Sequence, residues 1–423
     1  MNGYLRIYFI LFGLSMNVLM TTADHLMIDR RILQEAKTLI EHGHSVTLLA
    51  GFECEKRESY TQDGINIERF KYDWSDSRFL QLVKRIGLRP GTLIHKFAWL
   101  VFRSWAFRFS KLNSFEQYIV DRMFDFPADV IHIHDYPMLA AGVVAASKSN
   151  LPLVYDAHEL YYAQTQLPVK TQRKYKRREA RLIKKAHAVI TVNPYIAKLM
   201  QSRYKIPLPH VLMNAAYKKP FFPGDLIRKK FDIPECTKIV IYQGWISSNR
   251  GIDVLVSAAK YFKEGVVLVV VGYGEYESQL RKIVAENDLV DRVYFYGGVP
   301  SDSLHEVTCG ADLGVIPYHG VDENNFFCSP NKLFEFAVAK LPFICNDLPF
   351  LKDIINQYKN GIIADLSNPT AIAAVVNRFF QEDEAMSEIS AFAAKAGDDL
   401  NWDIEGKKLM SIYSNLPFNH RES

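Results

Sequence analysis

The stretch VVLVVVGYG at residues 266–274 decides the fold class of this chain. Its run from Val266 to Val271 contains no polar residue, which is typical of a strand buried on both faces of a parallel sheet. Gly272 and Gly274 belong to the loop that follows directly. These glycines match only part of a dinucleotide-binding fingerprint because the third glycine is missing, so an NAD site is disfavoured and a plain tight turn is the alternative.

Other short apolar runs alternate with helical stretches along the chain, which predicts an α/β protein with doubly wound parallel sheets. Strands are expected at 17–22, 44–50, 65–70, 129–134, 152–156 and 188–192, and in a second series at 238–243, 266–271, 292–297, 312–317, 342–346 and 361–364. A segment rich in Pro, Gly and Lys, Asn214 to Asp225, separates the two series. We therefore expect an N-terminal domain at 1–213, a C-terminal domain at 214–398, and a helix within 399–423 that returns to the first domain.

The composition is that of a globular protein long enough for two domains. Of its 423 residues, 48% are hydrophobic and 23% are charged, which argues against disordered, collagen-like and multi-span membrane classes. The five cysteines are scattered, so neither a disulfide framework nor a zinc site is indicated, and a reducing cytoplasm fits best. Residues 1–200 hold 28 Lys and Arg against 19 Asp and Glu, whereas residues 201–423 hold 23 against 28. Any anionic partner surface is therefore expected on the first half.

The N-terminal segment has two interpretations. Ile7 to Met20 is mostly apolar, follows Arg6 and precedes a run of small residues, as a cleaved signal peptide does. We favour the alternative, in which Asn17 to Thr22 is the first buried strand and residues 1–15 form an apolar extension. The reason is that the next segment has the pattern of the helix that follows such a strand.

Two basic stretches lie in the first half. Arg78 to Lys111 contains eight Lys and Arg, no acidic residue and several Trp and Phe, and Lys170 to Lys185 contains nine Lys and Arg against Glu179 alone. Cations interleaved with aromatic rings suit an anionic membrane surface, so we predict peripheral membrane attachment through both stretches. The alternative is a pair of ordinary helices with core aromatics and solvated cations. Nucleic acid is disfavoured as a partner because no recognised nucleic-acid module surrounds these stretches.

The most informative motif for function is SPNKLFE, at Ser329 to Glu335. Serine before proline predicts a helix start, with Ser329 as N-cap and Pro330 at the first helical position. Asn331 and Lys332 then lie in the first turn, where the helix dipole disfavours a cation unless an anion such as phosphate is bound. Glu335 lies one turn further along the same face, where a carboxylate can accept both hydroxyls of a ribose. The alternative is a surface lysine that tolerates the dipole.

Gly244 to Gly251 forms a second candidate anion site, a polar loop between a strand end and a helix. Glycine allows close approach of the backbone, and the Arg250 guanidinium can bind a diphosphate through two nitrogens. A solvated loop arginine is the alternative. This loop, the glycine loop at 272–274 and the start of the SPNKLFE segment are predicted to meet at the edge where open parallel sheets bind nucleotides.

In the first domain, polar residues end two neighbouring predicted strands. His132, His134 and Asp135 end the first, and Asp156-Ala157-His158-Glu159 ends the second. Alternating strand residues share a face, so His132 and His134 point the same way. Metal ligation and buried capping histidines are two explanations, and we favour histidines that contact a substrate in the cleft.

Together these motifs resemble those of the retaining GT-B glycosyltransferases of family four, over residues 17–415. The matching segments are DRRILQEA at 29–36, GHSV at 43–46, His134-Asp135, YDAHE at 155–159, Gln243-Gly244 with Arg250-Gly251, Gly272-Tyr273-Gly274, and SPNKLFE at 329–335. The resemblance implies a GT-B fold of two Rossmann-like domains facing a cleft. It also implies that Arg250 binds the diphosphate of a nucleotide-sugar donor, that Glu335 holds the ribose, and that His158 lies beside the transferred sugar.

On this resemblance, donor contacts are expected at Gly244, Gly272, Gly274, Asn331 and Lys332, and acceptor-side contacts at His134, Asp135 and Glu159. Three positions depart from the family. Phe327 replaces a glutamate that many members carry eight positions before the one matching Glu335, so sugar recognition must differ. Trp245 replaces a common arginine, which leaves Arg250 and Lys332 as the cations for the diphosphate. Thr22 to His25 stands where many relatives have a glycine-rich loop, so no acceptor contact is carried over there.

We therefore expect a retaining enzyme that transfers a sugar from a nucleotide-sugar to a glycan or lipid-linked acceptor, in cell-surface polysaccharide synthesis at the cytoplasmic face of the membrane. The sequence contains no Asp-x-Asp, so cations are expected to replace a metal at the diphosphate, and no cofactor is expected. One alternative is a nucleotide-sugar 2-epimerase, which resembles the same architecture but needs acid and base groups that Phe327 does not supply. Another is a sugar-nucleotide-binding protein without catalysis.

Overall fold

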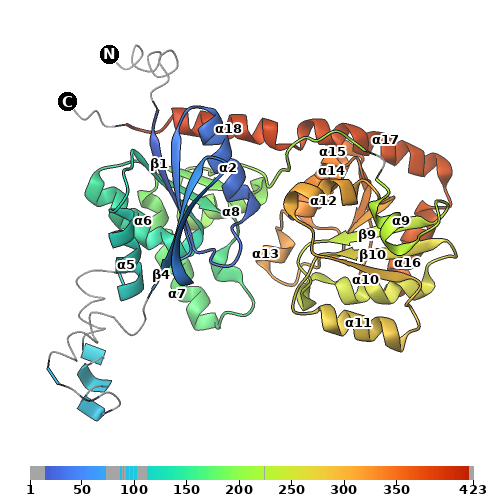
Figure 1. Cartoon of the computed structure of the whole chain (residues 1–423), viewed down its shortest axis with the longest axis horizontal. Helices are drawn as coiled ribbons and strands as arrows, with labels where there is room; N and C mark the ends of the chain where they lie inside the picture. Colours follow the sequence, from blue (N-terminus) through green and yellow to red (C-terminus); the bar gives the residue numbers. More distant parts are fainter. Residues whose placement is uncertain are drawn as a thin grey trace.

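The computed structural model describes residues 15–72, 112–222 and 224–418, together with isolated positions between 86 and 101. Figure 1 shows two α/β domains side by side along the long axis of the molecule. Residues 1–14 and most of the predicted membrane-binding stretch Arg78 to Lys111 lie outside the described residues.

The first domain contains an eight-stranded sheet in the order β3-β4-β2-β1-β5-β6-β7-β8. Neighbouring strands are parallel except β3, which runs antiparallel to β4 at the edge. The strands are β1 (Asn17–Thr22), β2 (Ser45–Ala50), β3 (Glu53–Gln62), β4 (Ile65–Lys71), β5 (Val130–His134), β6 (Leu153–Ala157), β7 (Ala188–Thr191) and β8 (His210–Val211). The helices are α2 (Arg30–Glu41), α5 (Ser114–Met123), α6 (Asp135–Ser149), α7 (Val169–Leu182) and α8 (Pro194–Tyr204), with short 3-10 turns at Tyr161–Ala163 and Ile183–Lys185.

The second domain contains a six-stranded sheet in the order β11-β10-β9-β12-β13-β14, with every neighbouring pair parallel. Its strands are β9 (Lys238–Gln243), β10 (Val266–Val271), β11 (Val293–Gly297), β12 (Leu313–Ile316), β13 (Phe343–Cys345) and β14 (Gly361–Ile363). Its helices are α9 (Leu226–Phe231), α10 (Ile252–Ala258), α11 (Glu277–Glu286), α12 (Ser301–Thr308), α13 (Glu323–Phe326), α14 (Asn331–Val338), α15 (Pro349–Tyr358) and α16 (Pro369–Phe379), with 3-10 turns at Ser248–Arg250 and Ala259–Tyr261.

The predicted strands are all present, with ends that differ by one residue at most. The six residues of β10 are all buried, as expected for an apolar strand covered on both faces. Two strands were not predicted, β3 and β8. The sequence of β3, ECEKRESYTQ, is polar because this edge strand is largely exposed, and β8 has only two residues, too few to form a recognisable pattern.

The last two helices, α17 (Asp383–Asp399) and α18 (Trp402–Ser414), run along one side of both domains (Figure 1). Helix α18 lies against the first domain, where Trp402 Nε1 donates to Thr38 Oγ1 of α2 at 2.8 Å. In the same helix, Glu405 accepts a hydrogen bond from the Met213 backbone, and the Tyr413 hydroxyl lies 2.8 Å from His132 Nδ1. No helix in the described part of the chain combines the length and the apolar composition needed to cross a membrane.

Candidate active site

Helix α14 carries the last five residues of the SPNKLFE motif, and its Glu335 contacts Arg30 of the first domain. The helix begins at Asn331 with Pro330 in the N-cap position, so the prediction that Ser329 caps it is wrong by one residue. The Ser329 hydroxyl is buried without a hydrogen-bond partner, and its backbone oxygen instead accepts from Asn214 Nδ2 at 2.9 Å. Lys332 still lies in the first helical turn, as the sequence predicts.

Lys332 is a buried cation without a hydrogen-bond acceptor. Its residue is 3% exposed, and its Nζ has no hydrogen-bond partner. The ammonium lies 3.6 Å from the ring centre of Tyr242 and 4.9 Å from that of Tyr318. Burial and the nearby Arg250 hold the pKa of Lys332 well below its ordinary value. An anion beside this group would remove the cost of burying its charge.

Arg250 reaches the same place from the loop after β9. Its Nη1 donates to the Tyr318 hydroxyl at 2.5 Å, and its guanidinium lies 5.1 Å from the centre of that ring. The structure therefore brings the two predicted phosphate ligands, Arg250 and Lys332, onto one tyrosine. Two cations side by side repel each other, so this arrangement favours a bound polyanion.

Glu335 lies three residues after Lys332, and both of its carboxylate oxygens are engaged. Oε1 is 2.6 Å from Nη1 of Arg30, which belongs to the first domain, and Oε2 accepts from Gln243 Nε2. The Glu335 side chain is 13% exposed and that of Arg30 is 21% exposed. The carboxylate expected to hold a ribose is therefore part of an ion pair that crosses the cleft.

Two of the three glycines in the predicted donor loops, Gly272 and Gly274, occupy crowded positions. A Cβ on Gly272 would lie 2.0 Å from the Gly244 oxygen, and one on Gly274 would lie 2.2 Å from the Ile246 oxygen. These glycines let the loops after β9 and β10 touch. Gly244 itself lies beside Lys332, because its Cβ would be 3.7 Å from Nζ. Only Gly244 is therefore placed next to the cationic group.

His158 follows β6 on the first-domain side of the cleft and is surrounded by carboxylates. Its Nε2 lies 3.2 Å from Asp156 Oδ2, and its Nδ1 lies 3.6 Å from Asp135 Oδ2 and 3.9 Å from Asp29 Oδ2. Asp135 has a left-handed backbone with φ of 61°, and its Oδ1 accepts from the His158 backbone at 2.9 Å. The His158 side chain is 12% exposed, so part of it remains accessible to a ligand.

These carboxylates decide the charge of His158. Burial alone would lower the pKa of this imidazole, but Asp135 and Asp156 raise it to about 10. Burial raises the pKa of Asp135 to about 7, although His158 acts against it. Burial also favours the neutral acid of Asp156, but Arg31 holds the pKa of Asp156 well below its ordinary value. At neutral pH His158 is therefore an imidazolium.

A buried network of hydrogen bonds and ion pairs around Arg31 holds Asp156, which contacts His158. Arg31 binds Asp156 through two nitrogens, each at 2.9 Å, and its Nε lies 2.9 Å from Glu35 Oε1. Its Nη1 donates to the Leu212 carbonyl and to Asn214, in the segment that leads to the second domain. Arg31 thus connects the support of His158 to the interdomain connection.

The histidines that end β5 lie behind His158. His132 and His134 stack with ring centres 4.5 Å apart, which confirms that they share a face. Both are fully buried, and His134 Nδ1 lies 3.3 Å from His158 Nε2. His134, which we expected on the acceptor side, is therefore placed to support His158 rather than to line the cleft.

Four buried groups, Glu35, His132, His134 and Asp156, have potential ligand atoms within 4.8 Å of one another. Both carboxylates of this group are already paired with the Arg31 guanidinium. A metal ion would have to share this space with a buried cation, so the donor set does not favour one.

Residues 322–327 connect the second domain to the first at α13. Glu323 binds Arg203 with an Oε1 to Nη2 distance of 2.5 Å, and Asn324 Nδ2 donates to Glu159 at 3.1 Å. The Phe327 ring stacks on Tyr195 with centres 6.0 Å apart. The position where many relatives carry a glutamate is thus used for contact between domains. Glu159, expected on the acceptor side, also contacts this segment.

Sequence reasoning assigned no role to Asp29, Arg30 and Arg31, although the motif DRRILQEA at 29–36 contains all three. Asp29 Oδ1 caps α2 by accepting from the Arg31 backbone at 2.8 Å, which leaves Oδ2 toward His158. A signal for the two arginines was present in the sequence. They follow a helix N-cap, where the dipole disfavours cations, and this rule is the one that singled out Lys332.

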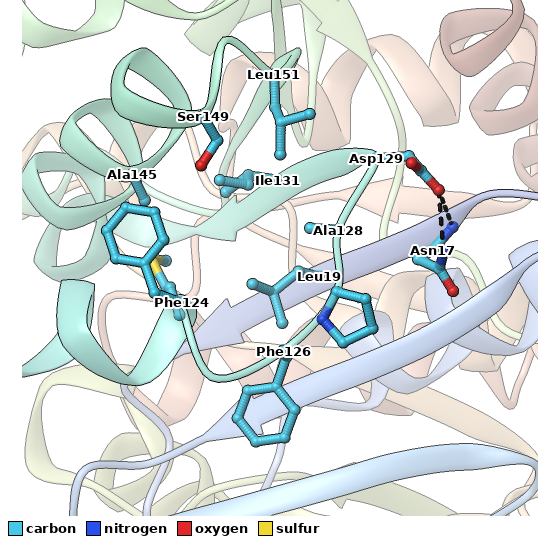
Figure 2. Close-up of a pocket in the computed structure, with 12 residues that line it drawn as sticks. Asn17, Leu19, Phe124, Phe126, Ala128, Asp129, Ile131, Ala145, Ser149 and Leu151 are labelled. Atoms are coloured by element: carbon cyan, nitrogen blue, oxygen red, sulfur yellow. Dashed lines mark hydrogen bonds between the residues drawn. The ribbon is translucent and has the colours of Figure 1, made fainter. Parts of the chain in front are cut away.

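A separate pocket of about 330 Å³ lies at the other end of the first sheet. Figure 2 shows it beside Leu19 and Ile131, with Asp129 bonded to the backbone and side chain of Asn17 at 2.8 and 3.1 Å. Among the described residues of its lining, Asp129 is the sole carboxylate, and none of the predicted site residues is one of them.

Two parallel-sheet domains, with their site residues gathered at the facing edges, define the GT-B class of glycosyltransferase folds. Residues 28–215 match the family described as Glycosyltransferase Family 4, and residues 224–396 match Glycosyl transferases group 1. Each half of the chain therefore matches a glycosyltransferase family, and the chain as a whole has the GT-B fold.

Individual relatives are distant. Amylovoran biosynthesis glycosyltransferase AmsK of Erwinia amylovora is 24% identical over 40% of this chain, and the match spans 43% of AmsK, less than half its length. D-inositol 3-phosphate glycosyltransferase of Xylanimonas cellulosilytica is 21% identical over 68% of this chain and 72% of its own. The solved structure of Alr3699/HepE from Anabaena, in complex with UDP and glucose, has a TM-score of 0.69 at 16% identity, over 95% of this chain and 100% of that one.

Proposed function

We propose that this chain transfers a sugar, with retention of anomeric configuration, from a nucleotide-sugar to a glycan or lipid-linked acceptor. The observation that carries the proposal is the buried, unpartnered amine of Lys332 beside Arg250 at the start of α14. A diphosphate supplies the negative charge that this pair lacks. The Anabaena neighbour, whose complex contains UDP and glucose, supports a nucleotide-sugar as the donor.

The donor is proposed to lie across the edge of the second domain. Its diphosphate binds Lys332 and Arg250, and its ribose hydroxyls bind Glu335. Asn331, exposed at the first position of α14, is placed at the same helix end. The transferred sugar then extends toward His158 on the opposite side of the cleft.

Retention is proposed to proceed by departure of the nucleotide from the face that the acceptor attacks. The bond between the anomeric carbon and the phosphate oxygen breaks while the acceptor oxygen forms the new bond. The acceptor's proton passes to the leaving diphosphate. Lys332 and Arg250 stabilise the charge that develops on that diphosphate, and His158 positions the sugar. Asp135 and Glu159 are proposed to contact the acceptor.

No metal is required in this proposal, because the two cations neutralise the diphosphate. A polysaccharide or a glycolipid is the proposed product class, in line with the name of the amylovoran relative. Purified protein with donor and acceptor tests the stereochemistry, since the anomeric coupling in the product, measured by NMR, distinguishes retention from inversion. An inverted product would remove the retaining assignment and leave the donor site untouched.

We also propose attachment to the anionic cytoplasmic face of a membrane. Within the described residues, this proposal rests on Arg173, Lys176 and Arg177 of α7, which line a cavity of about 310 Å³. Arg203 of α8 also lines it, but its charge is paired with Glu323. Such a cluster attracts anionic headgroups, and each cation near the surface contributes about 1 kcal/mol. The chain would then work where lipid-linked acceptors lie.

A further inference from the structure

The ion pair between Arg30 and Glu335 occupies the carboxylate that the proposed function gives to the ribose. Arg30 Nη1 lies 2.6 Å from Glu335 Oε1, and Gln243 donates to Oε2. With 13% of the Glu335 side chain exposed, little of the carboxylate remains open to a ligand. A ribose diol needs both oxygens, one for each hydroxyl.

The position of Arg30 is fixed by its neighbours. It is the first residue of α2, and the next residue, Arg31, is held by Asp156 through two hydrogen bonds of 2.9 Å. Before it, Asp29 caps the helix. These contacts fix the backbone at Arg30, and its side chain extends from there to Glu335 of the second domain.

We propose that Arg30 is a positioning residue that holds Glu335 in the nucleotide-free cleft and exchanges with the ribose diol when the donor binds. Gln243 stays in place, because each carboxylate oxygen has two lone pairs and the amide uses one. Arg30 then leaves Oε1, and one ribose hydroxyl takes its place. This inference rests on the proposed donor site.

The exchange predicts that Arg30 opposes one part of nucleotide binding. Because the diol must displace an ion pair, Arg30 weakens the contribution of the diol to nucleotide affinity. Removing the guanidinium should therefore strengthen that contribution, whereas removing an ordinary ligand-binding arginine would weaken binding. The effect depends on the diol, so it disappears for a nucleotide that lacks both hydroxyls.

The test measures the Kd of UDP and of GDP by calorimetry, each beside its 2′,3′-dideoxy analogue. For whichever nucleotide binds, the ratio of the dideoxy Kd to the normal Kd gives the preference for the diol. Because both nucleotides carry the same phosphates, this ratio cancels any effect of Arg30 on phosphate binding. The variants are Arg30→Ala, Arg30→Lys and Glu335→Ala, with Arg122→Ala as the matched control. Arg122 forms a 2.8 Å ion pair with Asp125 at the end of α5 and is not among the site residues.

We expect Arg30→Ala to raise the diol preference about two- to fivefold, the size of a partly exposed ion pair. Arg30→Lys should restore part of the wild-type value, and Arg122→Ala should leave it unchanged. In a Glu335→Ala background the preference should fall near one, and adding Arg30→Ala should then change nothing.

Suppose that wild type prefers the diol and that Glu335→Ala abolishes this preference. If Arg30→Ala then leaves the preference constant or lowers it, the proposed exchange is wrong, but the proposed donor site remains. A wild-type protein without diol preference would overturn the assignment of Glu335, and the exchange with it. Failure of both nucleotides to bind wild type would overturn the proposed function itself.

Discussion

The ammonium group of Lys332 lies 3.6 Å from the centre of the Tyr242 ring and has no hydrogen-bond acceptor. A ring face attracts a cation, but it does not replace the water that a buried ammonium loses. Such a group reduces stability unless a ligand completes it. The free protein therefore keeps a feature whose benefit appears only when an anion binds.

Replacing Lys332 by Met should separate stability from binding. We expect the free energy of unfolding to rise by about 1–2 kcal/mol, because a buried amine becomes apolar. Nucleotide affinity should fall by roughly one to two decades, and Arg250→Ala should reduce it similarly. Thermal melting and calorimetry measure the two effects, with exposed Lys282→Met as control. Unchanged nucleotide affinity in both site variants would show that Lys332 and Arg250 do not bind the diphosphate.

The charge of His158 should appear in the pH dependence of stability. Its folded pKa is about 10 against an ordinary 6.5, because Asp135 and Asp156 outweigh burial. A raised pKa adds stability that is complete below pH 6.5 and is lost as the pH rises toward 10. Urea unfolding should show this loss, at most about 1.4 kcal/mol per pH unit, and His158→Gln should flatten it. Equal slopes in both proteins would show that the imidazole is neutral.

Activity should survive removal of divalent ions. Lys332 and Arg250 provide the positive charge at the diphosphate, and Arg31 already pairs with the carboxylates of the buried cluster near His158. Turnover in EDTA should therefore equal turnover in buffer. If EDTA abolishes turnover and Mg²⁺ or Mn²⁺ restores it, the metal-free account is wrong.

Membrane binding should depend on charge and should be reversible. Wild-type protein should bind vesicles that contain anionic lipid, and salt should release it. Replacing exposed Arg173, Lys174 and Arg177 by Glu should weaken binding by at least two decades, since each cation contributes about 1 kcal/mol and each reversal adds repulsion. Replacing exposed Lys260, Arg281 and Lys282 of the second domain by Glu serves as the control with the same number of reversals. Equal binding to neutral vesicles would contradict the electrostatic attachment.

The fold was predictable because its strands are apolar on both faces. In β10 no exposed position interrupts the run, so the pattern alone distinguishes a buried parallel strand from an edge strand. The same reasoning cannot find β3, which is exposed and therefore polar. The unusual position of Lys332 in a first helical turn was also predictable from the sequence, because the helix dipole disfavours a cation there whatever the tertiary contacts are.

The remaining features of the site depend on residues that are far apart in sequence. Nothing local in the SPNKLFE motif shows that Arg30 pairs with Glu335, or that Arg31 supports Asp156 beneath His158. Likewise, the substitution at Phe327 signals a change in the site, but its stack on Tyr195 needs the folded interface. Pairings of this kind come from the approach of two domains, which no sequence period encodes.

Release of nucleoside diphosphate from a panel of UDP- and GDP-sugars, by wild type and His158→Ala, tests the central claim most directly. We predict that wild type turns over a donor when an acceptor is present. The variant should lose the stability that the raised pKa of His158 supplies. Its folded fraction should bind the donor almost normally, but with kcat lowered by about 10² or more through lost positioning and electrostatic contacts. No turnover by wild type across the panel, or a variant with near-wild-type kcat, would contradict the claim that sugar transfer takes place at this cleft.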